Sequence, residues 1–369
     1  MAVTDYAFCR GLEYPSIVAV SERVAWTVEA IFADRRFDAT KPLVPASWLS
    51  TEHLAFLDDR EQRTLNHIRA FSYVHLLGNY EEFIPIQMAE VASRDWHEDR
   101  IRLRELLRFG EEEMKHQQLF QRAENVLEAS CGHTFGRYFD RDKVRLTAFT
   151  NAVLAYPPLP RFLLLTAFEF GTQRHYVESV QASNGTGSDP LYVDILKHHW
   201  IEENQHTKAD ILEAARLAAG MSPAEISQAF DDVLGLGGLI GETFVGQVDQ
   251  ELATFEAVTG RILPEADRTA LRDALNQSLQ AIIAGVSLTH PSFKQVALEL
   301  SKEGAAKLGI ASTVARGSSN GPCAARYRRS CRGGQTPLTG LAGGQTQPRE
   351  YQLVTIGVAD LTQLFESMD

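Results

Sequence analysis

The sequence predicts an all-α protein built on a four-helix bundle with additional C-terminal helices. From about Arg60 to Leu308, apolar residues recur at steps of three and four, which is the period of an amphipathic helix. Strand-like alternation is hard to find in this region, and glycine and proline are sparse. The connections between the helical segments are short, about 5 to 15 residues, which suits antiparallel neighbours in a bundle.

Three breaks divide the first part of the helical region. They fall at Ser130–Asp142, at Pro157–Pro160 and at Asn184–Pro190, because proline removes a backbone donor and glycine-rich stretches favour turns. The helices predicted between these breaks are 58–91, 96–129, 143–155, 161–182 and 191–219.

The region 224–308 is predicted to contain two or three further helices. Ser222 is a good N-cap, and Pro223 occupies the first helical position. Breaks near Gly260–Pro264 and at His290–Pro291 divide this region. The accessory helices therefore follow the bundle in the chain.

Composition divides the chain into four parts. We expect residues 1–57 to be an N-terminal extension that packs on the bundle, and residues 58–311 to be the helical domain itself. The segment 312–349 contains six arginines and no acidic residue, and it is rich in glycine, serine and threonine. Such a segment cannot bury enough apolar surface to offset chain entropy, so we expect disorder there. Residues 350–369 form a short C-terminal segment.

The charge and the cysteine content exclude several classes of protein. The 369 residues carry a net charge of −12, whereas nucleic-acid-binding surfaces are basic. No apolar run is long enough to span a membrane, and the N-terminus lacks the apolar core of a signal peptide. The four cysteines form no CxxC pair. We therefore expect a cytoplasmic protein that contacts neither membrane nor nucleic acid.

Two segments match the pattern Glu-x-x-His, and both lie on predicted helices. They are Glu113–His116 and Glu203–His206. Residues three apart share one face of a helix, so each pair can offer a carboxylate and an imidazole to the same metal ion. Two matches are close to what chance gives in a chain of this size, so the pattern alone is weak.

A lone glutamate precedes each pair at nearly the same distance. Glu81 lies 32 residues before Glu113, and Glu169 lies 34 residues before Glu203. A dinuclear carboxylate site in a helical bundle takes one glutamate from each of two helices and one Glu-x-x-His pair from each of the other two. The order and spacing therefore predict a dinuclear metal site.

The two lone glutamates interrupt mostly apolar helical faces. A buried, unpaired carboxylate costs several kcal/mol unless it is neutralised or finds a cation, and metal ions would remove that cost. Carboxylate and imidazole ligands favour iron or manganese. We prefer Glu81 over its neighbour Glu82 because Glu81 lies on the apolar face, although the phase of this helix leaves both open.

His199 is a further candidate ligand. It precedes Glu203 by four residues and His206 by seven, so all three lie on one helical face. A third imidazole would complete the coordination of one metal. The alternative is a histidine beside His198 that contacts a ligand or the solvent.

These residues resemble those of the ferritin-like di-iron carboxylate superfamily, over about residues 60–215. The resemblance implies two iron ions, with manganese as an alternative, and O₂ as a co-substrate. Among the ligands, Glu113 and Glu203 would bridge the two irons. The iron ligands that the resemblance implies are Glu81, Glu113, His116, Glu169, Glu203 and His206.

Two subgroups of that superfamily compete. The p-aminobenzoate N-oxygenase-like family is similar in having a histidine at the position of His199. Soluble acyl-carrier-protein desaturases are similar in the segment Glu81–Pro85 and in a threonine at the position of Thr172. A radical-generating ribonucleotide reductase subunit is disfavoured, because it would carry tyrosine where this chain has Phe120.

The resemblance implies an O₂-dependent oxygenase or oxidase that acts on a small organic substrate, with amine N-oxygenation as one candidate reaction. Thr172 would act at the site by donating a hydrogen bond or relaying a proton. Electrons would come from an external reductase, because the sequence shows no flavin, nicotinamide or iron–sulfur motif. A homodimer is a further expectation. The alternatives are a desaturase-like oxidase and a metal-binding or storage protein without turnover.

Overall fold

The computed structural model describes residues 6–94, 96–139, 143–181 and 187–310, and every regular element within these ranges is helical. The prediction of an all-α protein is thus confirmed. The predicted segments 312–349 and 350–369 lie outside the described residues. The long helices of the first two thirds of the chain are α3 (Asp59–Tyr80), α4 (Ile84–Arg94), α5 (Arg100–Cys131), α6 (Lys143–Leu154), α7 (Pro158–His175) and α8 (Pro190–Ala219).

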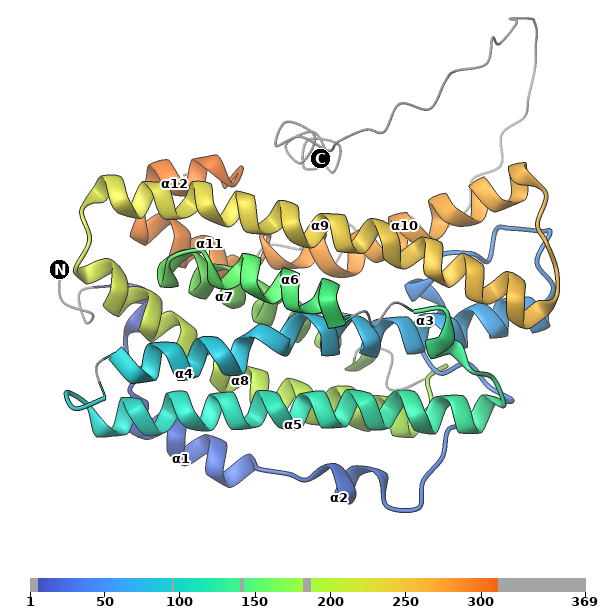
Figure 1. Cartoon of the computed structure of the whole chain (residues 1–369), viewed down its shortest axis with the longest axis horizontal. Helices are drawn as coiled ribbons and strands as arrows, with labels where there is room; N and C mark the ends of the chain where they lie inside the picture. Colours follow the sequence, from blue (N-terminus) through green and yellow to red (C-terminus); the bar gives the residue numbers. More distant parts are fainter. Residues whose placement is uncertain (1–5, 95, 140–142, 182–186, 311–369) are drawn as a thin grey trace, which may run out of the picture. The chain divides into compact units, whose positions relative to one another are not determined.

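Four of these helices surround the interior in which the candidate site lies. The pairs in contact are α3 with α5, α5 with α8, and α7 with α8. Helix α4 continues the line of α3 and packs along α5 (Figure 1). Apolar side chains of all four helices are buried: Phe71, Leu119 and Ile195 belong to one apolar cluster, and Phe162 belongs to a second.

Two short N-terminal helices, α1 (Tyr14–Val24) and α2 (Val28–Phe32), pack against both α5 and α8. Pro15 lies in the first turn of α1, and the Thr27 side chain caps α2 by accepting a hydrogen bond from the backbone of Ala30. The sequence patterns gave no indication of these helices, because both are short. They cover the side of the bundle on which α5 and α8 meet.

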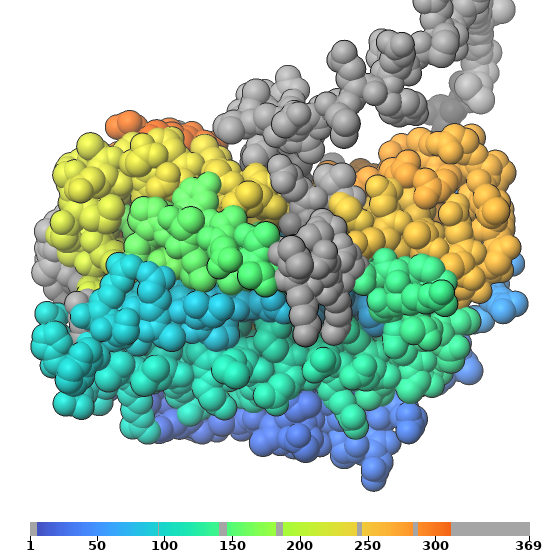
Figure 2. All heavy atoms as spheres, in the orientation of Figure 1, coloured from blue at the N-terminus to red at the C-terminus, as the bar shows by residue number. Residues whose placement is uncertain are grey.

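The C-terminal helices form a second layer of the molecule. They are α9 (Pro223–Thr259), α10 (Glu265–Ser287), α11 (Pro291–Leu300) and α12 (Lys302–Lys307), one more than the sequence predicted. Helix α9 packs on α3 and α7, and α10 packs on α7. The face shown in Figure 2 has α4, α5, α6 and α9 as adjacent bands. Helices α9 and α10 thus cover the bundle on the side of α3 and α7.

The predicted helix over 58–91 is interrupted at Glu81–Phe83, which form a turn of 3₁₀-helix between α3 and α4. Pro85 explains the interruption, because its nitrogen has no hydrogen to donate to the carbonyl of Glu81. At its start, α3 has a capping box between Asp58 and Glu61. The interruption therefore falls at a predicted metal ligand.

The predicted helix over 161–182 also differs from the structure. It begins earlier, at Pro158, because proline is well suited to the first position of a helix. Its last part, Tyr176–Gln181, is a π-helix, and π-helical turns are frequent near functional sites. No helix among the described residues is long and apolar enough to cross a membrane.

Candidate metal centre

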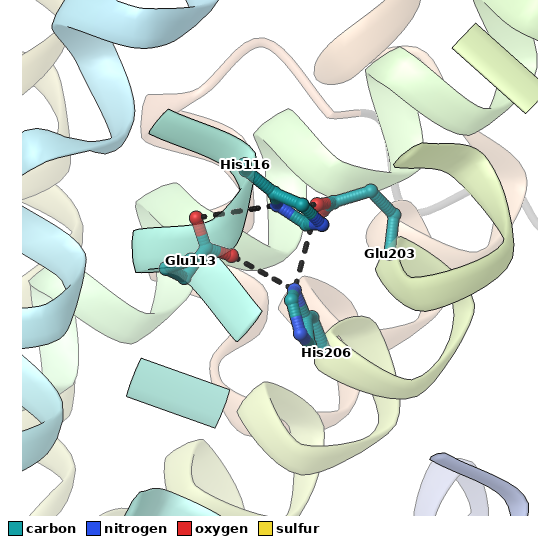
Figure 3. Close-up of side chains that lie close together, drawn as sticks. All are labelled: Glu113, His116, Glu203 and His206. Atoms are coloured by element: carbon teal, nitrogen blue, oxygen red, sulfur yellow. Dashed lines mark ion pairs between the residues drawn. The ribbon is translucent and has the colours of Figure 1, made fainter. Parts of the chain in front are cut away.

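Glu113 and His116 on α5 face Glu203 and His206 on α8 across the interior of the bundle (Figure 3). One ligand atom from each of the four side chains lies within 4.8 Å of the others, and all four residues are buried. The Nδ1 of His206 lies 2.8 Å from Oε1 of Glu113 and 3.4 Å from Oε1 of Glu203. The two Glu-x-x-His pairs thus converge on one point.

A second group of potential ligands shares His116 with the first. It consists of Glu81, His116 and His199, whose ligand atoms also lie within 4.8 Å of one another. The Nε2 of His199 lies 3.2 Å from Oε1 of Glu81 and 3.1 Å from Oε1 of Glu203. His199 therefore faces the cluster and not the solvent.

The structure distinguishes Glu81 from Glu82 as the candidate metal ligand. Glu81 is buried and points to the cluster, whereas Glu82 is exposed. The 3₁₀ turn brings Glu81 to the end of α3, where it faces His199 on α8. Among the two neighbours, Glu81 is the one that can bind a metal ion at this site.

Glu169 lies beside the cluster on α7 but belongs to neither group of converging ligands. Its carboxylate is buried and faces Asp210 on α8. Burial and the nearby charge of Asp210 raise the pKa of Glu169 well above its usual value. Burial is also the main cause that raises the pKa of Asp210, with the charges of Glu203 and Glu113 adding to it and the contact with Glu169 opposing it. The raised pKa values favour protonation of these carboxyl groups, and a metal ion that binds at Glu169 would compete with the protons.

Many buried polar atoms that face the cluster form no well-aligned hydrogen bond with the described residues, and the closest polar neighbours of several are other candidate ligands. An unpaired buried polar atom carries a desolvation cost, so a concentration of such atoms at one point calls for a ligand. The atoms are Oε2 of Glu81, both carboxylate oxygens of Glu113 and Glu169, Oε1 of Glu203, and Nδ1 of His116 and His206. Carboxylate and imidazole donors fit divalent iron or manganese.

The charges of the metal-free cluster respond to one another. Burial raises the pKa of Glu81 to about 7, in spite of His199 beside it. Burial alone would also raise the pKa of Glu203, but His199 and His206 outweigh it and hold that pKa well below its usual value. The carboxylates in turn hold the pKa of His206 well above its usual value against the effect of burial. Protonated histidines therefore supply positive charge that offsets the buried carboxylates.

Two further glutamates contact the Nε2 atoms of the ligand histidines. Each contact joins a glutamate on one of the helices α5 and α8 to a histidine on the other. The Oε2 of Glu202 on α8 lies 3.0 Å from Nε2 of His116 on α5. The Oε2 of Glu112 on α5 lies 3.1 Å from Nε2 of His206 on α8. Each contact leaves Nδ1 of the imidazole facing the cluster, which fixes both the tautomer and the orientation of the ligand.

Basic side chains pair with the charges of these two supporting glutamates, and a hydroxyl group donates a hydrogen bond to one of them. Arg108 lies 2.8 Å from Glu112, which also accepts a hydrogen bond from Ser21 of α1. Lys115 forms an ion pair with Glu202. The sequence patterns missed Glu112 and Glu202 as parts of the site. The signal was available, since each immediately precedes a predicted ligand glutamate.

Aromatic rings pack against the ligand imidazoles. Phe109 stacks on His206 with ring centroids 3.9 Å apart, and Phe120 lies 5.1 Å from His199. Trp26 of the N-terminal extension is parallel to His116 at 6.0 Å. These rings exclude water from the outer side of the cluster, where an exposed imidazole would otherwise be hydrated.

A small, mostly apolar cavity of about 60 Å³ adjoins the cluster. That volume holds a few water molecules, and it is well below the roughly 300 to 1,000 Å³ of a typical small-molecule site. Phe83 and Leu165 are among its apolar lining residues. Its polar lining close to the metal ligands comprises Glu81, Glu169, Thr172, Glu203 and Tyr73.

Thr172 lies on the wall of this cavity, one turn after Glu169. Its hydroxyl donates a hydrogen bond to the backbone carbonyl of Glu169 at 3.0 Å. That bond satisfies the hydroxyl within its own helix. The oxygen of Thr172 nevertheless remains an acceptor that faces the same cavity as the ligands.

Comparison with known proteins gives no match: the chain matches no protein-family model, no curated protein and no solved structure. The assignment of the site therefore depends on its residues and their geometry.

Proposed function

We propose that the buried cluster binds two iron ions and that the protein is an O₂-dependent oxidase or oxygenase of the ferritin-like di-iron kind. The observation that supports this proposal is the convergence of buried carboxylate and imidazole atoms that lack other partners. Such a constellation is costly without cations and is well suited to divalent metals with mixed nitrogen and oxygen ligands. Manganese is the alternative metal.

The residues that would hold the metals are those of the two groups together with Glu169. Glu113 and Glu203 would help to hold both ions, because each contacts more than one of the imidazoles. His199 serves as a third imidazole ligand. When bound, the metal pair would supply the electrons and the Lewis acidity for reaction with O₂.

The protein's own residues would orient the ligands and keep water out. Glu112 and Glu202 fix the imidazoles, and the aromatic rings around them shield the centre. The cavity beside Glu81 and Glu169 gives a diatomic molecule access to the ligands. A storage protein has no need for an apolar cavity at its metal site, so the cavity favours oxidation chemistry.

The substrate in this proposal is a small organic molecule that enters from the side of the cavity, with amine N-oxygenation as one candidate reaction. The cavity is smaller than such a substrate, so its walls on α9 and α10, marked by Ile240 and Ile282, would have to move apart. An external one-electron donor completes the proposed cycle.

Metal analysis of protein reconstituted with iron under anaerobic conditions tests the proposal. We expect about two irons per chain, by analogy with other dinuclear carboxylate bundles. Exposure to O₂ should then oxidise both irons, as followed by optical and Mössbauer spectroscopy. Fewer than two irons, or iron that O₂ leaves in the ferrous state, would contradict the oxidase proposal. Stable loading without O₂ reactivity would instead support a metal-binding protein.

A further inference from the structure

Tyr73 and His175 form a hydrogen-bonded pair beside the candidate metal centre. The phenolic oxygen of Tyr73 on α3 lies 2.9 Å from Nδ1 of His175 near the end of α7. Both side chains are buried, at 5% exposure each. Tyr73 also lines the cavity that Glu81, Glu169 and Glu203 line, so its ring lies next to the proposed ligands.

The number of polar atoms that each arrangement leaves unpaired indicates which group donates this hydrogen bond. The Nε2 of His175 has no partner among the described residues. If the phenol donates to Nδ1, only the Nε2–H group is left unpaired. If Nδ1 donates instead, both the phenolic hydrogen and the Nε2 lone pair are unpaired, which costs more. The phenol therefore donates, and the imidazole accepts.

His175 is a neutral base in this environment. Burial lowers its pKa to about 3, so the ring is neutral at physiological pH. Trp48 covers both rings, with ring centroids 4.6 Å from Tyr73 and 4.5 Å from His175. The indole is itself 1% exposed. The pair is thus buried, and the hydrogen-bond partner of the phenol among the described residues is the imidazole of His175.

A phenol is oxidised most easily when its proton leaves together with the electron. Tyr192 provides the internal comparison. It is buried against the same Trp48, but its hydroxyl donates to the backbone carbonyl of Ala70, which cannot take up a proton. Among these two tyrosines, only Tyr73 has a base as its acceptor and a place on the wall of the cavity beside the ligands.

We propose that Tyr73 is a redox-active residue that gives one electron to the oxidised metal centre and its phenolic proton to Nδ1 of His175. The inference rests on the proposed function for its oxidant, the O₂-oxidised dinuclear centre. The products are a neutral phenoxyl radical, an imidazolium ion and a centre reduced by one electron. An external one-electron donor then reduces the radical, and the proton returns from His175 to the phenolate oxygen.

The first experiment uses iron-loaded protein that is mixed with O₂, frozen and examined by electron paramagnetic resonance. We expect an organic radical signal whose hyperfine structure changes when the tyrosines are deuterated. Tyr73→Phe and His175→Gln should abolish it, because one lacks the phenol and the other lacks a base. The matched control Tyr192→Phe should retain it. Iron content and circular dichroism confirm that each variant is loaded and folded.

A second experiment separates this inference from the proposed function. Metal-free protein is oxidised with a photogenerated ruthenium(III) polypyridyl oxidant, which replaces the metal centre. A tyrosyl radical that disappears in Tyr73→Phe and His175→Gln but persists in Tyr192→Phe supports the pair even if iron loading fails. Oxidation of both irons without an organic radical would overturn the inference and leave the oxidase proposal standing. A photogenerated radical that is unchanged in Tyr73→Phe would overturn it as well.

Discussion

Glu202 on α8 contacts Nε2 of His116 on α5 at 3.0 Å, so the helix that carries one ligand pair supports the histidine of the other. The contact from Glu112 to His206 repeats this relationship in the opposite direction. Each supporting glutamate immediately precedes a ligand glutamate in the sequence. The two helices are therefore coupled twice through the candidate site, and a change in one helix reaches both metal positions.

Glu202→Gln should weaken metal binding by about 10- to 100-fold, which is typical when a partner that orients a ligand histidine is removed. The amide keeps the size of the side chain but loses the charge that favours the correct tautomer of His116. Competition with a calibrated chelator measures the change. Glu111→Gln is the matched control, because Glu111 is an exposed acid of α5 next to the supporting residue Glu112, and its replacement should have no effect.

Glu169→Ala should lower the iron content from about two ions per chain to about one, because one metal position loses its carboxylate from α7. The remaining ligands on α5 and α8 still define the other position. Metal analysis after desalting measures the stoichiometry. Retention of two tightly bound ions would show that Glu169 is not a ligand.

Glu81→Gln should likewise cost one metal ion, whereas Glu82→Gln should not. Glu81 is buried and contacts His199, while its neighbour is exposed. The two variants have the same composition and differ only in which face of the 3₁₀ turn is changed. Equal metal contents in the two variants would remove Glu81 from the list of ligands.

His175 should make the metal-free protein less stable in acid. Burial lowers its pKa to about 3 in the folded protein, whereas the ordinary value of 6.5 applies in the unfolded chain. Between these values the unfolded chain binds a proton that the folded chain does not. The free energy of unfolding should therefore fall by about 1.4 kcal/mol for each pH unit below 6.5 from this group alone.

Urea denaturation at several pH values, with wild type and His175→Gln compared, measures this effect. The difference between the two isolates His175 from the other titrating groups. The variant should show a shallower loss of stability between about pH 6 and pH 4, since it lacks the titrating ring. Parallel pH profiles would mean that folding leaves the pKa of His175 near its ordinary value.

Arg69→Met should destabilise the protein by about 3 to 5 kcal/mol, because it leaves the buried carboxylate of Glu251 without its cation. Arg69 lies 2.9 Å from Glu251 on α9, and it also donates to the carbonyl of Leu275 on α10. Chemical denaturation measures the loss. The double variant Arg69→Met, Glu251→Leu should recover much of it, since no charge then stays buried unpaired.

The sequence located the helices and most of the candidate ligands because both depend on local spacing. Glu113 with His116, and Glu203 with His206, share a helical face wherever the helix packs. The apolar face of the helix favours Glu81 over Glu82 as a ligand, and Glu81 is the one of the two that is buried in the structure. Pro85 interrupts that helix without moving Glu81 from the interior. Helices α1 and α2 were not predicted, because they span only 11 and five residues.

The contacts between helices followed from no such pattern. Glu112 could have been part of a solvated face, and only the rotation of α5 against α8 turns it towards His206. Asp210 is as buried as Glu169, yet its sequence context gave no reason to pair the two. Residues of these kinds acquire their roles from the packing of helices that are far apart in the chain.

By itself, the sequence determined an all-α chain with two Glu-x-x-His pairs and two lone glutamates, because a period of 3.6 residues and a spacing of three are properties of a single helix. The tertiary structure decided which atoms meet. It brought Glu81 and His199 to one cluster, set Glu169 against Asp210, and placed Tyr73 against His175 across 102 residues. Side chains on different helices come within bonding distance only through the packing that buries the apolar faces, and that packing is a property of the whole core.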